Sequence, residues 1–161
     1  MASRRLLDDQ LYDRPGNPLQ AARSTLRIRR DGARGILTFK GPVLKGPVKI
    51  REEIETEVSN TMALEGIVAA LGFTPFFRAQ KYREEFEVGA GETLATLAMD
   101  DTPIGIYVEI EAERETIAQV AEAMGRSVND YVLNSYQRLF TIWATARGES
   151  TKAMLVRSDV R

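Results

Sequence analysis

The chain of 161 residues contains no cysteine and no histidine. Without cysteine, it has no disulfides, no thiolate nucleophile and no cysteine-ligated zinc. Without histidine, it lacks Ser-His-Asp catalysis, a histidine general base and histidine-ligated metals. Any metal must therefore bind oxygen ligands, which favours Mg²⁺ or Mn²⁺. Any acid–base chemistry must use a carboxylate, lysine, tyrosine or metal-bound water.

The sequence also lacks long hydrophobic runs. No stretch approaches the length of a membrane-spanning helix, and the two arginines near the N-terminus are not followed by the apolar stretch of a signal peptide. A cytoplasmic protein with no membrane partner is expected. The 43% hydrophobic and 28% charged content is typical of a soluble globular domain. We expect one domain over residues 1–147 and a polar, frayed tail over residues 148–161.

Charge is unevenly distributed along the chain. Residues 1–51 hold 12 Lys and Arg against 4 Asp and Glu, whereas residues 52–161 hold 10 against 19. A basic N-terminal part is compatible with nucleic-acid binding. However, these basic residues are spread through predicted strands, and few aromatic residues for base stacking are interleaved with them. The pattern favours basic and acidic strands that meet at a shared site, and a nucleic-acid partner is not expected.

Charged residues recur at every second position in several short segments. The segments are Thr25–Arg29, Thr38–Lys40, Lys49–Glu57, Lys81–Arg83 and Tyr107–Glu111. Side chains alternate across a strand, so a sheet built from these segments has one apolar and one charged face. The charged face is either solvated, as in many antiparallel sheets, or turned inward as a lumen. The dominance of Arg and Glu, and the segregation of basic from acidic segments, favour a lumen suited to a polyphosphate and its divalent metal.

The remaining elements follow from hydrophobic periodicity and turn residues. Strands are predicted at about 24–31, 34–40, 48–57, 77–88, 93–100 and 104–111, and helices at about 60–71, 113–124 and 129–147. In the first helix, Met62, Ile67, Val68 and Leu71 form the predicted buried stripe. In the last helix, Leu133, Tyr136, Phe140 and Trp143 form a stripe that suits either the core or the surface of a homodimer.

Six ordered motifs resemble those of a known family. They are Tyr12-Asp13, Leu26–Arg29, Thr38–Pro42, Arg51–Glu55, Lys81–Arg83 and Gly105–Glu111. Together they resemble the CYTH superfamily of triphosphate tunnel enzymes over about residues 8–140, and they are most similar to bacterial class IV adenylate cyclases. The resemblance implies an α+β fold: an antiparallel eight-stranded, tunnel-like β-barrel with a charged lumen and flanking helices.

The resemblance also implies roles for individual residues. Phosphate-binding positions match Arg27, Arg29, Lys40, Arg51, Lys81 and Arg83. Carboxylates for Mg²⁺ or Mn²⁺ match Glu109 and Glu111, with Asp100 as a further candidate, and Glu53 and Glu55 match a catalytic pair that positions water or a second metal. The implied substrate is ATP, tripolyphosphate or thiamine triphosphate. The implied reaction is cyclisation of ATP to cyclic AMP and pyrophosphate, or triphosphate hydrolysis; an inactive triphosphate-binding module is the third alternative.

One family motif is absent from the sequence. The family begins with a strand carrying Glu-x-Glu-x-Lys, and no such motif precedes Tyr12-Asp13. Asp8 and Asp9 are poor substitutes, because adjacent residues of a strand point to opposite faces. We therefore expect the first strand of the family to be missing. The chain is then a fragment, a mis-started product or a diverged member of the family. A missing strand would also leave two open edges in the sheet.

Overall fold

The computed structural model describes residues 4–156 apart from residues 45, 47 and 49. Its strands are β1 (Arg5–Asp13), β2 (Thr25–Asp31), β3 (Arg34–Lys40), β4 (Glu53–Val58), β5 (Thr74–Val88), β6 (Ala95–Thr102), β7 (Gly105–Glu111) and β8 (Ala153–Met154). Its helices are α1 (Pro18–Ala21), α2 (Thr61–Ala70), α3 (Arg114–Ala123) and α4 (Tyr136–Thr145), with short 3₁₀ turns at η1 (Gly91–Thr93) and η2 (Val128–Asp130).

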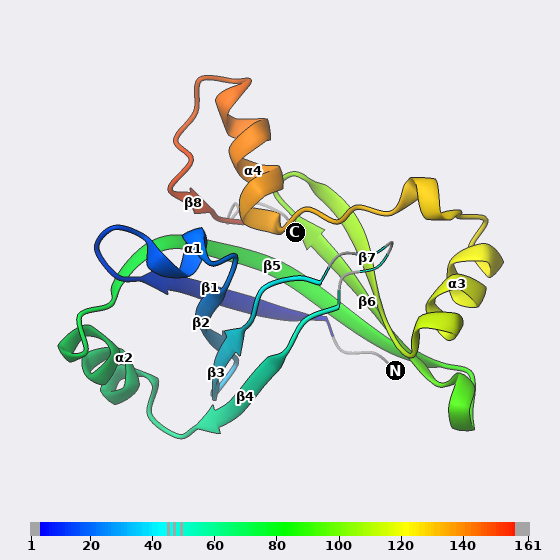
Figure 1. Cartoon of the computed structure of the whole chain (residues 1–161), viewed down its shortest axis with the longest axis horizontal. Helices are drawn as coiled ribbons and strands as arrows, with labels where there is room; N and C mark the ends of the chain where they lie inside the picture. Colours follow the sequence, from blue (N-terminus) through cyan, green and yellow to red (C-terminus); the bar gives the residue numbers. More distant parts are fainter. Residues whose placement is uncertain (1–3, 45, 47, 49, 157–161) are drawn as a thin grey trace.

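The strands form one sheet in the order β4-β3-β2-β1-β5-β6-β7, and every neighbouring pair along this path is antiparallel. The short β8 pairs parallel with β5 and is the eighth strand. In the part of the chain that the structure describes, β4 and β7 end the sheet, and no ladder joins them. The eight-stranded sheet and its flanking helices confirm the α+β class predicted from sequence (Figure 1).

Helix α2 covers the apolar face of the sheet over β1, β2 and β3. Tyr12 of β1, Ile28 of β2 and Val68 of α2 form a buried cluster. The predicted four-residue stripe on α2 is wrong, because only Val68 is buried, whereas Met62 and Leu71 are 78% and 60% exposed. The sequence of α2 is apolar on more than one face, so periodicity alone did not identify the face that meets the sheet. The helix itself was predicted correctly, and Gly72 follows its end with φ of +83°.

A second core lies between α4 and the sheet. Phe140 and Ala144 of α4 pack with Phe77 of β5 and with Met154 of β8. Met154 is fully buried in this core. The prediction of a frayed tail from residue 148 onward is therefore wrong at β8. Residues 157–161 of that tail lie outside the described residues.

The last helix begins seven residues later than predicted from periodicity. The side chain of Ser135 accepts a hydrogen bond from the backbone N–H of Arg138, which caps α4 at its N-terminus. Upstream, Ser127 and Asp130 close a separate 3₁₀ turn. Leu133 consequently precedes the helix and is 47% exposed, whereas the rest of the predicted stripe lies on α4. No helix in the described ranges is long and apolar enough to span a membrane.

Candidate active site

The strand register places the alternating charged residues on one face of the sheet. Arg27 of β2 lies opposite Thr38 of β3, which lies opposite Glu55 of β4. Beyond β1, Arg83 of β5 lies opposite Asp100 of β6. Residues opposite each other in register share a face. The charged face therefore carries Asp9, Arg27, Arg29, Lys40, Glu53, Glu55, Lys81, Arg83, Asp100, Glu109 and Glu111.

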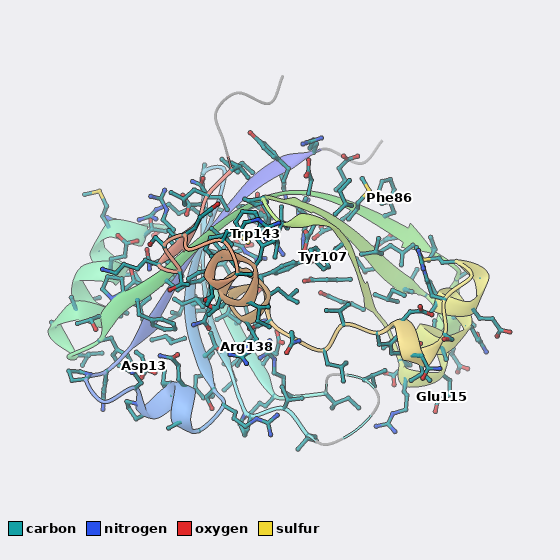
Figure 2. The ribbon with its side chains drawn as sticks, turned by 90° about the horizontal axis from the view of Figure 1, so that it is seen from above. Asp13, Phe86, Tyr107, Glu115, Arg138 and Trp143 are labelled. Atoms are coloured by element: carbon teal, nitrogen blue, oxygen red, sulfur yellow. The ribbon has the colours of Figure 1, made fainter. Side chains whose placement is uncertain are left out.

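Helix α4 covers part of this charged face. Viewed from above, α4 lies between the β1–β4 half of the sheet and the β6–β7 half, beside Tyr107 (Figure 2). The ring of Tyr107 meets the ring of Tyr136 edge-on, with centroids 5.5 Å apart. The hydroxyl of Tyr136 donates to Asp100 Oδ2 at 2.7 Å. The charged face is thus partly enclosed by a helix.

Asp100 is the centre of the charge network on the β5–β7 half. It is fully buried and accepts hydrogen bonds from Lys81 Nζ at 2.6 Å and from two guanidinium nitrogens of Arg83 at 2.6 and 2.7 Å. Burial alone would raise the pKa of Asp100, but the hydrogen bonds from Arg83 and the charge of Lys81 outweigh it and hold the pKa below its usual value. Asp100 is therefore a buried anion that fixes two cations.

Glu109 binds the same two cations from the more exposed side. Its carboxylate accepts from Arg83 Nη2 at 2.5 Å and lies 3.8 Å from Lys81 Nζ. The side chain of Glu109 is 39% exposed, against 6% for Arg83. Lys81 and Arg83, two of the six cations predicted to bind phosphate, are thus held by carboxylates in this structure, and an anion could reach Arg83 Nη2 only by displacing Glu109.

On the β1–β2 half, Asp9 binds Arg29. Asp9 accepts two hydrogen bonds from the guanidinium of Arg29, at 2.6 and 2.8 Å. Burial opposes ionisation of Asp9, yet the hydrogen bonds and charge of Arg29 leave its pKa below the ordinary value. Asp8 points to the opposite face and pairs with Arg78. Strand alternation correctly predicts that the two aspartates lie on opposite faces, but Asp9 was not predicted to belong to the charged face.

Arg27 is the least satisfied cation of the face. Its Nη2 donates to Thr38 Oγ1 at 3.0 Å, while its nearest carboxylate oxygens, on Glu55 and Asp9, lie 3.5 and 3.7 Å away. Its Nε is the one buried side-chain polar atom without a hydrogen-bond partner among the described residues. Burial, with a contribution from nearby Arg29, lowers the pKa of Arg27. A buried guanidinium with an unused N–H is a site to which an anion can bind.

Two more cations lie near Arg27 and share one carboxylate. Lys40 Nζ donates to Glu53 at 2.7 Å, and Arg51 Nε donates to the same side chain at 3.1 Å. Burial and the charge of Arg27 lower the pKa of Lys40, although Glu53 acts in the other direction. Arg51 precedes β4, which begins at Glu53 and not at about residue 48 as predicted. The β2–β4 half therefore concentrates positive charge.

Among the predicted metal ligands, Glu109 and Glu111 lie two residues apart on the charged face of β7, and Glu111 is exposed. The described residues contain no group of three or more acidic side chains arranged to hold a metal ion. Asp100 offers no free access, because it is buried and accepts four hydrogen bonds. Of the three predicted metal ligands, Glu111 is exposed, and Glu109 is 39% exposed but accepts a hydrogen bond from Arg83.

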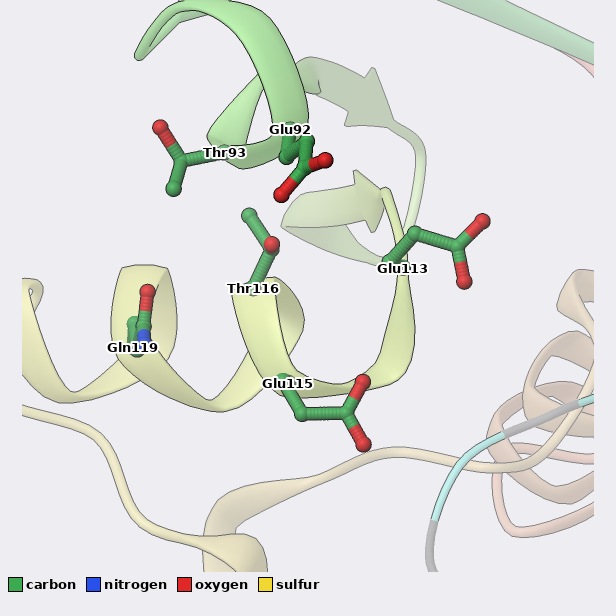
Figure 3. Close-up of a pocket in the computed structure, with 6 residues that line it drawn as sticks. All are labelled: Glu92, Thr93, Glu113, Glu115, Thr116 and Gln119. Atoms are coloured by element: carbon green, nitrogen blue, oxygen red, sulfur yellow. The ribbon is translucent and has the colours of Figure 1, made fainter.

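Two cavities lie outside the charged face. One, of about 420 Å³, lies at the N-terminus of α3 and is lined by Glu92, Thr93, Glu113, Glu115, Thr116 and Gln119 (Figure 3). Its lining has three carboxylates and no cation, which does not suit a phosphate. The other, of about 500 Å³, has its charges in the ion pairs Asp8–Arg78 and Arg30–Glu65. Neither cavity contains a residue predicted from sequence to be functional.

Comparison with known proteins identifies the family. The model of the CYTH domain matches residues 2–132. The chain belongs to the CYTH family. The motifs that carried the resemblance in the sequence fall inside this matched range, and all of them except Tyr12-Asp13 contribute to the charged face.

Several CYTH-type relatives are similar to this chain. A Methanocaldococcus jannaschii protein named "Putative adenylate cyclase MJ0240" is 26% identical over 124 residues, which cover 71% of this chain and 69% of the relative. The PH1819 protein of Pyrococcus horikoshii has a TM-score of 0.71 and 25% identity, covering 89% and 88% of the two chains. The HpAC1 protein of Hippeastrum shares the fold, with a TM-score of 0.64, 16% identity, and coverage of 99% and 87%.

Proposed function

We propose that this CYTH protein is a metal-dependent enzyme that acts on a triphosphate bound along the charged face. The observation that carries the proposal is Arg27, a buried cation with an unused Nε–H whose contacts to the carboxylates of Glu55 and Asp9 are long, at 3.5 and 3.7 Å. Long ion-pair contacts offset the cost of burying a cation only in part, so a bound anion that contacts the free Nε–H would stabilise it further. Lys40 and Arg51 lie on the neighbouring strand and loop and extend the positive charge to a second phosphate group.

The carboxylates of β7 fit a divalent metal by their chemistry. Mg²⁺ prefers oxygen ligands and is commonly held by one or two carboxylates together with substrate phosphates. Glu109 and Glu111 provide two carboxylates on one face, and Glu109 contacts the cations Arg83 and Lys81. A bound Mg²⁺ or Mn²⁺ would neutralise phosphate charge and polarise the phosphorus–oxygen bond.

The protein's own residues would bind and orient the phosphates. Arg27, Lys40 and Arg51 would grip one end of the polyphosphate, and Arg29, held by Asp9, would contact its middle. At the other end, Arg83 would exchange its exposed contact with Glu109 for a phosphate oxygen while Asp100 keeps its guanidinium in place. Preorganised cations of this kind stabilise the charge that develops on the transferred phosphoryl group.

We favour hydrolysis as the reaction. Ionic side chains predominate on both halves of the charged face, whereas a nucleobase site is usually built from apolar and aromatic groups. In hydrolysis, a water oxygen attacks the terminal phosphorus, the bridging P–O bond breaks, and orthophosphate and a diphosphate result. Glu55, which lies beside Arg27 and Thr38, and Glu53 are the carboxylates available to orient that water and accept its proton.

Cyclisation of ATP is the second candidate. Tyr107 lies on the charged face two residues before Glu109, and its ring offers a surface on which adenine can stack. The Methanocaldococcus relative carries the name of an adenylate cyclase, and the Hippeastrum protein is named as an adenylyl cyclase with a dominant triphosphatase activity. One fold is thus associated with both reactions by name.

Phosphorus NMR of the chain with tripolyphosphate, ATP or thiamine triphosphate, in Mg²⁺ and then in Mn²⁺, tests the proposal. Release of orthophosphate identifies a triphosphatase. Formation of pyrophosphate together with a cyclic monophosphate identifies a cyclase. Unchanged spectra with all three substrates in both metals would contradict an enzymatic role and leave a triphosphate-binding module. The variant Arg27→Met, which removes the buried cation, is the matched control for contaminating phosphatase.

A further inference from the structure

Tyr136, the first residue of α4, touches two parts of the charge network at once. Its hydroxyl donates to Asp100 Oδ2 at 2.7 Å. The face of its ring lies against the ammonium of Lys81, with Nζ 4.5 Å from the ring centroid. These contacts join residues of α4, β5 and β6 that are 36 to 55 positions apart in sequence.

We infer that Tyr136 is a positioning residue for the phosphate-binding cations Lys81 and Arg83. The lysine side chain has four rotatable bonds, and in this site its ammonium meets Asp100 on one side and the Tyr136 ring on another. Glu109, the carboxylate that an incoming phosphate would replace, lies 3.8 Å from the same Nζ. The role rests on the proposed function, since it concerns how the cations meet a phosphate.

The hydroxyl extends the same role to Arg83. Asp100 Oδ2 accepts from Tyr136, Lys81 and Arg83 Nη2, while Oδ1 accepts from Arg83 Nε. A carboxylate held by donors from three side chains cannot rotate without breaking several bonds together. The guanidinium that it binds in a two-point contact is then fixed in direction as well as in place.

Helix α4 is suited to hold Tyr136 still. Its N-terminus is capped by Ser135, and four residues beyond Tyr136, on the same side of the helix, Phe140 is buried against Phe77. A tyrosine at the first position of a capped and anchored helix has little freedom. The phenol ring also contacts Tyr107, which lies on the charged face of β7. Helix α4 therefore contributes to the site and does not only cover it.

The matched variants are Tyr136→Phe, which removes only the hydroxyl, and Tyr131→Phe, which makes the same change at a tyrosine between η2 and α4 that has no hydrogen bond to the charge network among the described residues. Tripolyphosphate binding is measured by calorimetry in EDTA, and turnover is measured with Mg²⁺. We expect Tyr136→Phe to bind tripolyphosphate roughly 3- to 10-fold more weakly, as expected for losing a hydrogen bond to a charged group. Its KM should rise more than its kcat falls, and Tyr131→Phe should match the wild type.

A double-mutant cycle distinguishes positioning from a general structural effect. If Tyr136 acts through Lys81 and Arg83, then the effect of Tyr136→Phe on binding is smaller in a Lys81→Met background and smaller in an Arg83→Met background than in the wild type. Additive losses in both double variants, or wild-type binding by Tyr136→Phe, would overturn the inference. Thermal unfolding of each variant establishes that it is folded.

The positioning role can be tested even if the wild type does not bind tripolyphosphate. Failure to bind tripolyphosphate contradicts the proposed function but leaves the positioning role open to a separate test. That test uses the ammonium resonance of Lys81 in ¹⁵N-lysine spectra, which is assigned by its loss in Lys81→Met. We expect this resonance to lie upfield because of the Tyr136 ring, and its exchange with water to accelerate in Tyr136→Phe. An unchanged exchange rate in that variant would refute the positioning role.

Discussion

Replacing Glu109 with glutamine should separate the two roles that we assign to this carboxylate. As a metal ligand it supports turnover, but with no metal bound it occupies Arg83 Nη2 at 2.5 Å and competes with phosphate. The variant should therefore lose metal-dependent turnover and, in EDTA, bind tripolyphosphate more tightly than the wild type. A loss of turnover together with tighter metal-free binding is expected only of a carboxylate that pairs with a substrate-binding cation.

The size of the gain follows from the exposure of the pair. Glu109 is 39% exposed, so its attraction to Arg83 is screened and is worth about 1 kcal/mol. Removing that competition should strengthen metal-free tripolyphosphate binding about fivefold. Arg83 keeps its two hydrogen bonds to Asp100, so it is not left unpaired and the melting temperature should change little.

Calorimetry in EDTA and phosphate release with Mg²⁺ or Mn²⁺ measure the two effects, with Glu122→Gln on the exposed part of α3 as the control. Weaker metal-free binding by Glu109→Gln would refute the competition between Glu109 and phosphate. Wild-type turnover by the same variant would refute its role as a metal ligand.

Three further substitutions test other parts of the structure. Arg27→Met should weaken tripolyphosphate binding at least tenfold in calorimetry with little change in the melting temperature, because the buried cation that it removes has only long ion-pair contacts to Glu55 and Asp9; unchanged binding would contradict its role. Asp9→Asn should destabilise the fold by about 3 kcal/mol at pH 7 in urea unfolding, because Arg29 loses its partner. The pKa of Asp9 is lower in the folded than in the unfolded chain. The contribution of Asp9 to folding stability is therefore complete above the unfolded pKa of about 4 and is lost as the pH falls through the folded pKa. The stabilities of the wild type and of Asp9→Asn should thus converge in acid, and a difference that stays constant with pH would show another cause. Met154→Ala should cost about 2–5 kcal/mol in the same assay if β8 belongs to the core, and an effect below about 0.5 kcal/mol would show that it does not.

The charged face was predictable because alternation is a local property of a strand. The segments around Arg27, Lys81 and Glu109 reveal in sequence which side chains share a face, and the register confirms it. The order of these motifs also led to the correct family and to the α+β class.

The contacts between the charged residues were not predictable in the same way. The ion pair between Arg5 and Glu85 joins residues 80 positions apart, and its formation depends on the register of β1 against β5. Asp9 was missed because its segment shows no E-x-E pattern, although it lies opposite Arg29 once β1 and β2 pair. A carboxylate on a strand distant in sequence from a basic motif gives no local signal of its role.

The helices and the C-terminus illustrate a second limit. Tyr136 was assigned to an apolar stripe, and its hydrogen bond to Asp100 depends on how α4 docks across the sheet. The start of α4 depends on the hydrogen bond by which Ser135 caps the helix. The hydrophobic periodicity of the sequence extends further upstream, so it predicted an earlier start. Met154 lies in a polar segment, so only the tertiary structure identifies it as a core residue.

The most direct test of the central claim is calorimetric titration of the intact chain with tripolyphosphate, with orthophosphate as the comparison, at low and high salt. An extended charged face with several separate cations predicts that tripolyphosphate binds at least tenfold more tightly than orthophosphate and that added salt weakens this binding. Equal affinities for the two anions, or no binding of tripolyphosphate with or without Mg²⁺, would contradict the assignment of the charged face as a triphosphate site.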